Sequence, residues 1–348
     1  MSKRIKKASM QDIADYVGVS KNTVSLAVNN KPGVSDKRRA EILQAARMLH
    51  YGGLGTLAND AGDTVLVVAP SYVVDDRQFY PEIIWEVEQA ARHEGLSMIL
   101  TNITQSMQEH ATLPALLRDR VPRGIILLGV LPPTYVARLL ASELRVIHVD
   151  TYDIETPCPS VVTDNLVGAA QLVRYLHSQG HRDIGFIGPI RMTTSVFERW
   201  MGFQFAMRER DLPINQAHCL LDGSYYVADD AEISSFLDRV VPNLPAAWFC
   251  GNDRMATTLI HALTARGIRV PDDVSVAGFD DADTAVQVLP KLTTMRVRRD
   301  LLAANAVRIL CASEWPANPP IRLCVVPELV VRDSVAPYPL LAETYMPR

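Results

Sequence analysis

The chain carries SMQDIADYVGVSKNTVSLAVN at residues 9–29, and this stretch predicts two short helices joined by a tight turn. Ser9 is suited to cap the first helix and Gly18 to end it. Ser20 stands where a second helix needs its cap. Each helix then has one apolar face, formed by Met10, Ile13, Ala14 and Val17 in the first and by Val24, Ala27 and Val28 in the second.

The polar side of the second helix has the side chains that read DNA bases. Lys donates to guanine O6 and N7, and Asn pairs with both N6 and N7 of adenine. We expect Leu26 to be exposed on this face, where it would meet a thymine methyl. A third helix, capped by Ser35 and running from Asp36 to about Leu49, completes a helix-turn-helix head. The residues expected at the DNA are Ser9, Lys21, Asn22, Ser25, Leu26, Asn29 and Lys37.

Charge is divided unequally along the chain. Residues 1–50 carry ten Lys and Arg against four Asp and Glu, whereas the remaining residues carry 25 basic and 35 acidic side chains. A basic head on an acidic body predicts that the head meets a polyanion. The alternative is a small helical cap with a solvated face, but the caps and the exposed polar face favour the DNA-binding interpretation.

The rest of the 348 residues predicts an α/β core of parallel sheets. Short apolar strands alternate with amphipathic helices, and about 280 residues are enough for two lobes that face each other. The expected strands are 65–69, 98–101, 125–128, 146–149, 184–188, 247–250 and 274–279, and the expected helices are 82–93, 136–141, 167–178, 200–210, 231–240 and 255–266. Ligands of such sheets bind beyond the carboxyl ends of strands. The residues that follow these ends are Pro70–Tyr72, Asp150–Thr151, Gly188–Pro189, Gly251–Asp253 and Asp280–Asp281.

Several classes of function lack support in the sequence. It contains no Walker loop, no His-Glu-x-x-His, no Gly-x-Ser-x-Gly and no dinucleotide fingerprint after the first strand, so we expect no enzyme activity, cofactor or metal site. The five widely spaced cysteines are expected to be buried, reduced thiols. No apolar run is long enough to span a membrane, and no signal peptide is evident. We therefore expect a cytoplasmic protein.

Motifs along nearly the whole chain resemble the lactose/galactose-repressor (LacI/GalR) family of transcription regulators. The head carries the stretch quoted above, followed by Val34-Ser35. The core carries, in the expected order, Asp164-Asn165, Gly180-His181-Arg182, Phe186-Ile-Gly188, Arg199 with Gly202-Phe203, Phe249-Cys-Gly-Asn-Asp253, Arg269-Val-Pro-Asp-Asp-Val-Ser-Val-Ala-Gly-Phe-Asp-Asp281, Leu292-Thr-Thr294 and Pro327-Glu-Leu-Val-Val-Arg332.

The resemblance implies a domain organisation. The head would take residues 1–50 and a hinge 51–63. The effector-binding and dimerisation core, a pair of lobes like those of periplasmic binding proteins, would take 64–337, and a tail 338–348. Because the family's chain crosses three times between lobes, the N-terminal lobe would take 64–160 and 292–322, and the C-terminal lobe 161–291 and 323–337.

The resemblance also implies a homodimer that binds a palindromic operator and an effector in the cleft between the lobes. The positions that match the family's effector contacts are Ser71, Phe79, Asp164, Arg199, Asn252 and Asp280. A carboxylate and an Arg can each hold two vicinal hydroxyls, and an aromatic ring can cover a sugar's apolar face. Local roles are open for some of these residues, since Asp164, Asp280 and Asn252 could be helix or turn caps, Arg199 an ion-pair partner, and Phe79 a core residue.

The hinge departs from the family pattern. Relatives insert a hinge-helix Leu into the minor groove, whereas the ungapped register here places Asp60 at that position. Leu54 or Leu57 could substitute after a slip in register. The glycines of Tyr51-Gly-Gly-Leu-Gly disfavour a helix by about 1 kcal/mol each relative to Ala, so we expect a weakly formed hinge.

The first hypothesis for the function is a repressor controlled by a small polar effector, with a sugar as the favoured class. Its variants respond to a nucleobase or to a protein corepressor. A sugar-binding receptor that does not control DNA is the alternative from another class, and the basic head argues against it.

Overall fold

The computed structural model describes residues 9–28, 33–49, 61–119, 121–223, 230–315 and 319–338. The chain divides into two compact units: one contains the helical head together with residues 61–64 and Ala115–Arg123, and the other contains the rest of the α/β core. The predicted Asn29, Leu54 and Leu57 lie outside the described residues, as do positions 51–60 and 339–348 of the predicted hinge and tail. No helix within the described ranges is both long enough and apolar enough to span a membrane.

Three helices form the head: α1 (Met10–Val17), α2 (Lys21–Val28) and α3 (Asp36–Met48). The Ser9 side chain accepts from the backbone N–H of Asp12, whose carboxylate accepts from the backbone N–H of Ser9 in return. Gly18 ends α1 with a left-handed backbone, φ 71°. The apolar faces of the three helices meet at Ile13, Val24 and Ile42, which are fully buried. The predicted helix-turn-helix is confirmed.

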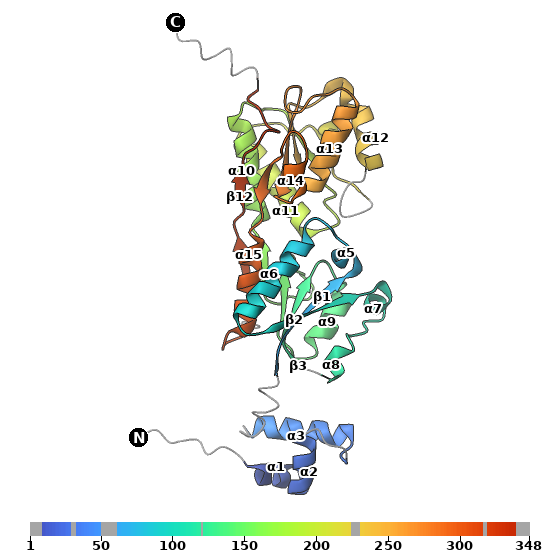
Figure 1. Ribbon diagram of the computed structural model, residues 1–348, viewed down its shortest axis with the longest axis vertical. Helices are drawn as coiled ribbons and strands as arrows, with labels where there is room; N and C mark the ends of the chain where they lie inside the picture. Colours follow the sequence, from blue (N-terminus) through green and yellow to red (C-terminus); the bar gives the residue numbers. More distant parts are fainter. Residues whose placement is uncertain are drawn as a thin grey trace, which may run out of the picture. The chain divides into compact units, whose positions relative to one another are not determined.

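The core alternates strands and helices as predicted, and its two lobes are each built on one six-stranded sheet (Figure 1). The strands are β1 (Ala61–Pro70), β2 (Ser97–Ile103), β3 (Val121–Leu128), β4 (Val146–Val149), β5 (Ser160–Thr163), β6 (Ile184–Ile187), β7 (Cys219–Leu220), β8 (Ala247–Cys250), β9 (Ser275–Asp280), β10 (Thr293–Arg296), β11 (Arg322–Val325) and β12 (Glu328–Val330). The helices are α5 (Ser71–Val74), α6 (Tyr80–His93), α7 (Gln105–Glu109), α8 (Leu116–Asp119), α9 (Pro133–Leu140), α10 (Asn165–Ser178), α11 (Thr194–Glu209), α12 (Asp230–Val240), α13 (Asp253–Ala265), α14 (Thr284–Gln287) and α15 (Arg299–Cys311), with 3-10 turns at Gln216–His218 and Val241–Asn243.

Sheet membership shifts the predicted lobe boundaries. The N-lobe sheet has the order β11-β5-β4-β3-β1-β2, and the C-lobe sheet the order β12-β10-β9-β8-β6-β7. Because β5 and β11 pair with each other while β10 pairs with β9, the chain changes lobe after residues 163, 296 and 325, not after 160, 291 and 322. The edge strand β12 pairs with β10 antiparallel, an exception to the predicted parallel sheets. Strand periodicity does not reveal which sheet a strand joins.

Aromatic side chains fill the C-lobe core. Phe186, Phe249 and Phe279 of the sheet and Phe203 of α11 are fully buried in one cluster. Trp248 is fully buried on the opposite face of the sheet and donates from Nε1 to the carbonyl of His218 at 3.1 Å. The prediction of five buried thiols is wrong in part: all five are free, but only Cys250 is buried, and Cys324 is exposed on the outer strand β11.

Helices α10 and α11 pack unusually closely, because Gly202 leaves room for the neighbouring backbone. A Cβ at this position would overlap the carbonyl oxygen of Leu166 and stand 2.9 Å from the Cβ of Ala169. This close approach brings the start of α11, and with it Arg199, against the start of α10.

We therefore expect Gly202→Ala to lower the free energy of unfolding by about 1–3 kcal/mol, since overpacking outweighs the better helix propensity of Ala. Urea denaturation measures the change. Met201→Ala, at the 42% exposed neighbour, is the matched control and should stay within about 0.5 kcal/mol of wild type. Equal stability of Gly202→Ala and wild type would contradict the close-packing argument.

Candidate functional site

The first turn of α2 presents two of the predicted DNA-reading residues to solvent. Ser20 caps this helix, and its Oγ accepts from the backbone N–H of Thr23 at 3.1 Å. Lys21 and Asn22 follow at once and are both exposed. An exposed Lys-Asn pair at the amino end of a second helix fits the geometry by which such helices enter a major groove. Lys37 is likewise exposed in the first turn of α3.

The carboxyl end of α2 differs from the prediction. Leu26 is half-buried and not exposed, as is Ser25. The Nη1 of Arg39 donates to the carbonyls of Leu26 and Ala27 at 3.2 and 3.0 Å. The side chain of Arg39 on α3 therefore holds the carboxyl end of α2 against α3. Ser9 is engaged in its own helix cap, where its hydroxyl donates to Asp12 at 2.7 Å.

A cavity of about 250 Å³ lies in the core between the carboxyl ends of strands from both sheets. This volume is near the lower end for small-molecule sites. It lies where doubly wound sheets bind ligands, beyond β4, β8 and β9. The lining residues are Tyr72, Asp75, Asp76, Gln78, Phe79, Tyr80, Asp150, Thr193, Ser195, Val196, Arg199, Asn252, Asp253, Arg254, Asp280 and Ala282.

Arg199 is the most heavily constrained side chain of this cavity. It is 3% exposed, and its Nη1 lies 3.1 Å from Oδ1 of Asp280 and donates to the carbonyl of Gly251 at 2.6 Å. Its Nε donates to Oδ1 of Asn165 at 2.9 Å. The guanidinium lies 3.8 Å from the ring centroid of Phe279, a cation–π contact. These contacts fix a planar donor group at the edge of the cavity.

Two buried carboxylates accompany Arg199. Burial raises the pKa of Asp150 to about 7, although Arg199 acts in the opposite direction. The Oδ1 atom of Asp150 is buried and has no hydrogen-bond partner among the residues that the structure describes. Burial also raises the pKa of Asp280, whose backbone has the left-handed φ of 119°. The pair provides acceptors that a ligand with hydroxyl or N–H groups would satisfy.

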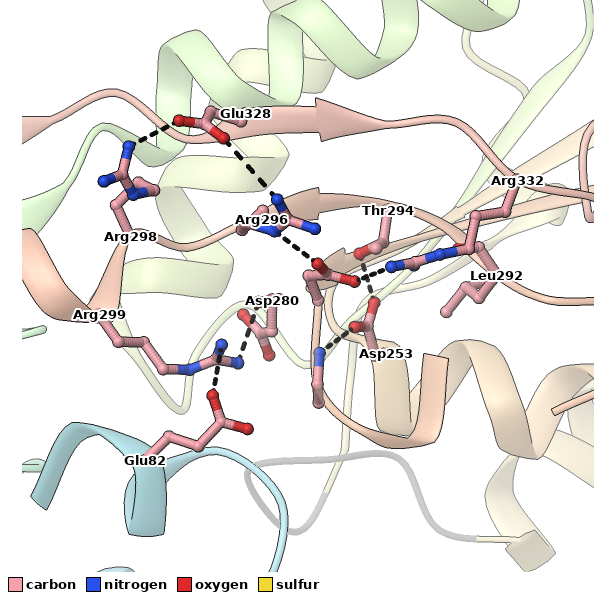
Figure 2. Close-up of polar contacts among 12 residues, drawn as sticks. Glu82, Asp253, Asp280, Leu292, Thr294, Arg296, Arg298, Arg299, Glu328 and Arg332 are labelled. Atoms are coloured by element: carbon pink, nitrogen blue, oxygen red, sulfur yellow. Dashed lines mark hydrogen bonds and ion pairs between the residues drawn. The ribbon is translucent and has the colours of Figure 1, made fainter. Parts of the chain in front are cut away.

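Asp253 and Asp281 have local roles. Asp253 is fully buried and accepts from Oγ1 of Thr294 at 2.5 Å and from the backbone N–H of Ala282 at 2.8 Å (Figure 2). Asp281 pairs with Arg296 at 2.7 Å and Arg332 at 2.6 Å. Both therefore shape the turn after β9 that carries Asp280.

Arg299 joins the two lobes beside this turn. Its Nη1 lies 2.9 Å from Oε2 of Glu82 on α6, and its Nη2 donates to the backbone carbonyl of Asp280 at 3.0 Å. Figure 2 shows Arg299 between these two residues. The guanidinium also lies 5.0 Å from the ring centroid of Phe79. Arg299, an N-lobe residue, thus contacts the backbone of Asp280, the C-lobe residue whose carboxylate lines the cavity.

The structure brings together four of the six predicted effector contacts: Phe79, Arg199, Asn252 and Asp280 line the cavity. Ser71 and Asp164 do not line it. Ser71 donates to Oδ1 of Asn102 at 3.0 Å, and Asp164 caps α10 by accepting from the N–H of Val167 at 3.1 Å. Asn252 has the predicted capping role, because its Oδ1 accepts from the first turn of α13, and the residue also borders the cavity.

Other lining residues were not among the predicted contacts. Asp150 and Tyr72 are among the residues that follow strand ends, so the sequence signal was present for both. Thr193 and Ser195 precede Arg199 at the start of α11, and no strand end marks them. Asp75 and Asp76 follow the short helix α5. The lining contains five Asp and two Arg, and burial raises the pKa of three of these carboxyls, Asp150, Asp253 and Asp280.

Comparisons with known proteins agree along the whole chain. Residues 9–52 match the family model "Bacterial regulatory proteins, lacI family", and residues 173–335 match "Periplasmic binding protein-like domain". The chain is 30% identical to the HTH-type transcriptional repressor PurR of Histophilus somni (strain 129Pt), over 94% of this chain and 99% of that protein. It is 29% identical to the HTH-type transcriptional regulator DegA of Bacillus subtilis (strain 168), over 95% and 99%.

Solved structures show the same fold. A complex of the transcriptional regulator CelR with cellobiose has a TM-score of 0.69 at 25% identity and covers 94% of this chain and 99% of that one. The lac repressor dimer bound to operator and an anti-inducer has a TM-score of 0.66 at 23% identity, with coverage of 95% and 100%.

The raised pKa of Asp150 predicts a pH-dependent stability. Because the folded pKa is about 7 and the ordinary value is 3.8, the folded protein keeps a proton that the unfolded chain has released. The contribution of Asp150 to the free energy of unfolding is therefore full below about pH 4 and is lost as the pH rises through 7. Asp150→Asn should gain stability relative to wild type over this window, by at most about 1.4 kcal/mol per pH unit. Urea denaturation from pH 5 to 8 measures it, and parallel curves for the two proteins would refute it.

Proposed function

Because the chain belongs to the LacI family of DNA-binding transcription regulators, we propose that it is a repressor that binds a palindromic operator as a homodimer. A small polar effector in the cavity between the lobes controls its affinity for that operator. The observation that carries the proposal is the buried Arg199–Asp280 pair beside Asp150, whose Oδ1 has no hydrogen-bond partner among the described residues, in a cavity lined from both lobes. A ligand that bridges the lobes there changes their relative position, and with it the DNA affinity.

The head supports the DNA-binding part of the proposal. Lys21 and Asn22 are exposed at the amino end of α2 and supply base-reading groups. A helix-turn-helix of this size reads one half-site, so two copies are needed for a palindrome one or more helical turns long. A sugar receptor that does not bind DNA would have no use for an exposed Lys21 and Asn22 at the amino end of α2. The proposed role places the protein in the same compartment as the chromosome.

A sugar or another neutral polyhydroxylated molecule is the effector class that the cavity favours. Buried carboxylates accept from hydroxyl pairs, Arg199 donates to hydroxyl or ring oxygens, and the ring of Phe79 can cover an apolar sugar face. The solved complex of CelR with cellobiose, at 25% identity to this chain, supports this class.

A nucleobase is the second candidate, favoured by the aromatic wall of the cavity. Tyr72, Phe79 and Tyr80 all line it, and the rings of Phe79 and Tyr80 lie 5.3 Å apart. A flat heterocycle can stack on such a wall while its N–H groups donate to Asp150 or Asp280. A protein corepressor would need no enclosed cavity of this kind.

The first experiment is selection of bound duplexes from a random DNA pool at physiological salt. Enrichment of a palindrome supports the repressor proposal and supplies the operator. Titration of that operator in the presence of neutral mono- and disaccharides, purines and pyrimidines then separates the effector classes. No enrichment, with or without these compounds, would overturn the DNA-binding proposal.

The head generates a prediction that distinguishes base reading from phosphate contact. Asn22→Ala should change the preferred base at one half-site position and cost about 1–3 kcal/mol only on the preferred sequence. Lys37→Ala is the matched control and should weaken binding to all sequences alike and reduce the salt dependence. Sequencing of selected duplexes and salt titrations measure both. A uniform loss for Asn22→Ala would count against its base-reading role.

The cavity generates a second prediction. Asp280→Asn keeps the shape of the side chain but removes the charge that pairs with Arg199 and accepts from the effector. We expect effector affinity to fall about 10- to 100-fold, the range for a charge-assisted hydrogen bond. Operator affinity without effector should change far less. Calorimetry and operator titration measure these values, and an unchanged effector affinity would remove Asp280 from the site.

A further inference from the structure

A second set of contacts crosses between the lobes outside the lining of the cavity. Tyr152 lies between β4 and β5, two strands of the N-lobe sheet. Its hydroxyl donates to Oε1 of Glu198 at 2.8 Å. Glu198 is a residue of α11, which connects β6 and β7 of the C-lobe sheet. This hydrogen bond therefore joins one lobe directly to the other.

The contacts continue from Glu198 to Arg199. The second oxygen of Glu198, Oε2, accepts from Nδ2 of Asn165 at 3.0 Å. The Oδ1 of the same Asn165 accepts from Nε of Arg199 at 2.9 Å. Asn165 is 2% exposed and also donates to the carbonyl of Thr163 at 3.2 Å, so its amide is held in one orientation. Three consecutive hydrogen bonds thus connect Tyr152 with the guanidinium at the cavity.

The N-lobe end of this chain of contacts is also fixed. The guanidinium carbon of Arg322, on β11, lies 3.3 Å from the ring centroid of Tyr152. Because β11 belongs to the N-lobe sheet, the ring follows that lobe when the lobes move. The carboxylate of Glu198 consequently has one oxygen held from each lobe.

We propose that Glu198 is a positioning residue that couples lobe position to the orientation of Arg199, with Tyr152 as its N-lobe partner. This inference rests on the proposed effector control. A movement of the N-lobe that displaces Tyr152 removes one bond from Glu198, and the loosened carboxylate then orients Asn165 and Arg199 less firmly. In the opposite direction, an effector that fixes Arg199 favours the lobe position in which the Tyr152–Glu198 bond forms.

A different hydrogen bond between the lobes can be compared with the one between Tyr152 and Glu198. Oγ1 of Thr151 and Oγ1 of Thr194 are 3.3 Å apart, so the first turn of α11 also contacts the N-lobe. Neither hydroxyl is joined to Arg199 by the hydrogen bonds found in the described part of the chain. A contact of this kind stabilises one lobe arrangement without orienting the guanidinium.

Hydrogen–deuterium exchange on the full-length protein tests the coupling without any ligand. Tyr152→Phe removes one hydroxyl and keeps the ring under Arg322. We expect peptides covering residues 165–170 and 194–202 to exchange about five- to tenfold faster, the size of one hydrogen bond's contribution. Faster exchange confined to residues 150–156 would overturn the proposal, because it would show a merely local role.

A second variant and a control sharpen this test. Glu198→Leu has no acceptor for either Tyr152 or Asn165, so the same two peptides should exchange faster. Tyr175→Phe removes a half-buried hydroxyl from α10 itself, ten residues and about 15 Å along the helix from Asn165. This control should leave residues 194–202 unchanged. A change there equal to that of Tyr152→Phe would also overturn the proposal.

Operator titration then measures the coupling in function. The sugar used is one that shifts the operator affinity of the wild type, and the quantity measured is the ratio of operator Kd with sugar to operator Kd without it. In Tyr152→Phe this ratio should move at least about threefold closer to one. Operator affinity in the absence of sugar should change little. An unaltered ratio would overturn the role in switching. If no sugar shifts the wild type, the proposed effector class fails, while the exchange result still decides whether Tyr152 and Arg199 are linked.

Discussion

The burial of the Arg199 guanidinium is the constraint on which the core of this protein depends. A cation at 3% exposure is costly unless its donors are satisfied. Asp280, the carbonyl of Gly251, Asn165 and the ring of Phe279 meet this requirement together. They come from three parts of the C-lobe, namely strand β9, the turn after β8 and helix α10, so the position of one side chain depends on the correct packing of these parts.

The same constraint explains why small residues and strained backbone gather nearby. Gly202 lets α11 approach the backbone of α10 closely enough for Arg199 to reach Asn165. Asp280 has a left-handed backbone, held by the ion pairs of Asp281 with Arg296 and Arg332. Local strain of this kind persists where the surroundings determine it, and it is typical of ligand sites.

Beside this site the lobes contact each other through polar side chains. Arg299 connects Glu82 with the backbone of Asp280 on one side, and Tyr152 reaches Glu198 on another. Polar contacts of this type rearrange at small cost when a ligand adds its own hydrogen bonds. A cavity with unsatisfied acceptors between two such lobes is therefore suited to convert ligand binding into a movement of the lobes.

The head, the α/β class and the family could be predicted from the sequence, because helix caps, apolar periodicity and motif order are local properties of the chain. The family resemblance also predicted Phe79, Arg199, Asn252 and Asp280 as members of one site, and all four line the cavity. Of these residues, Asn252 and Asp280 lie at strand ends, where parallel sheets bind ligands, whereas Phe79 directly precedes α6, Arg199 belongs to α11, and no strand end marks them. Tertiary contacts alone reveal that Leu26 is half-buried, that Ser71 and Asp164 have local partners, and that Oδ1 of Asp150 is buried beside the cavity with no hydrogen-bond partner among the described residues. Sheet membership of β5, β10 and β11, and the link from Tyr152 to Arg199, depend on contacts between segments far apart in the chain, which no local pattern encodes.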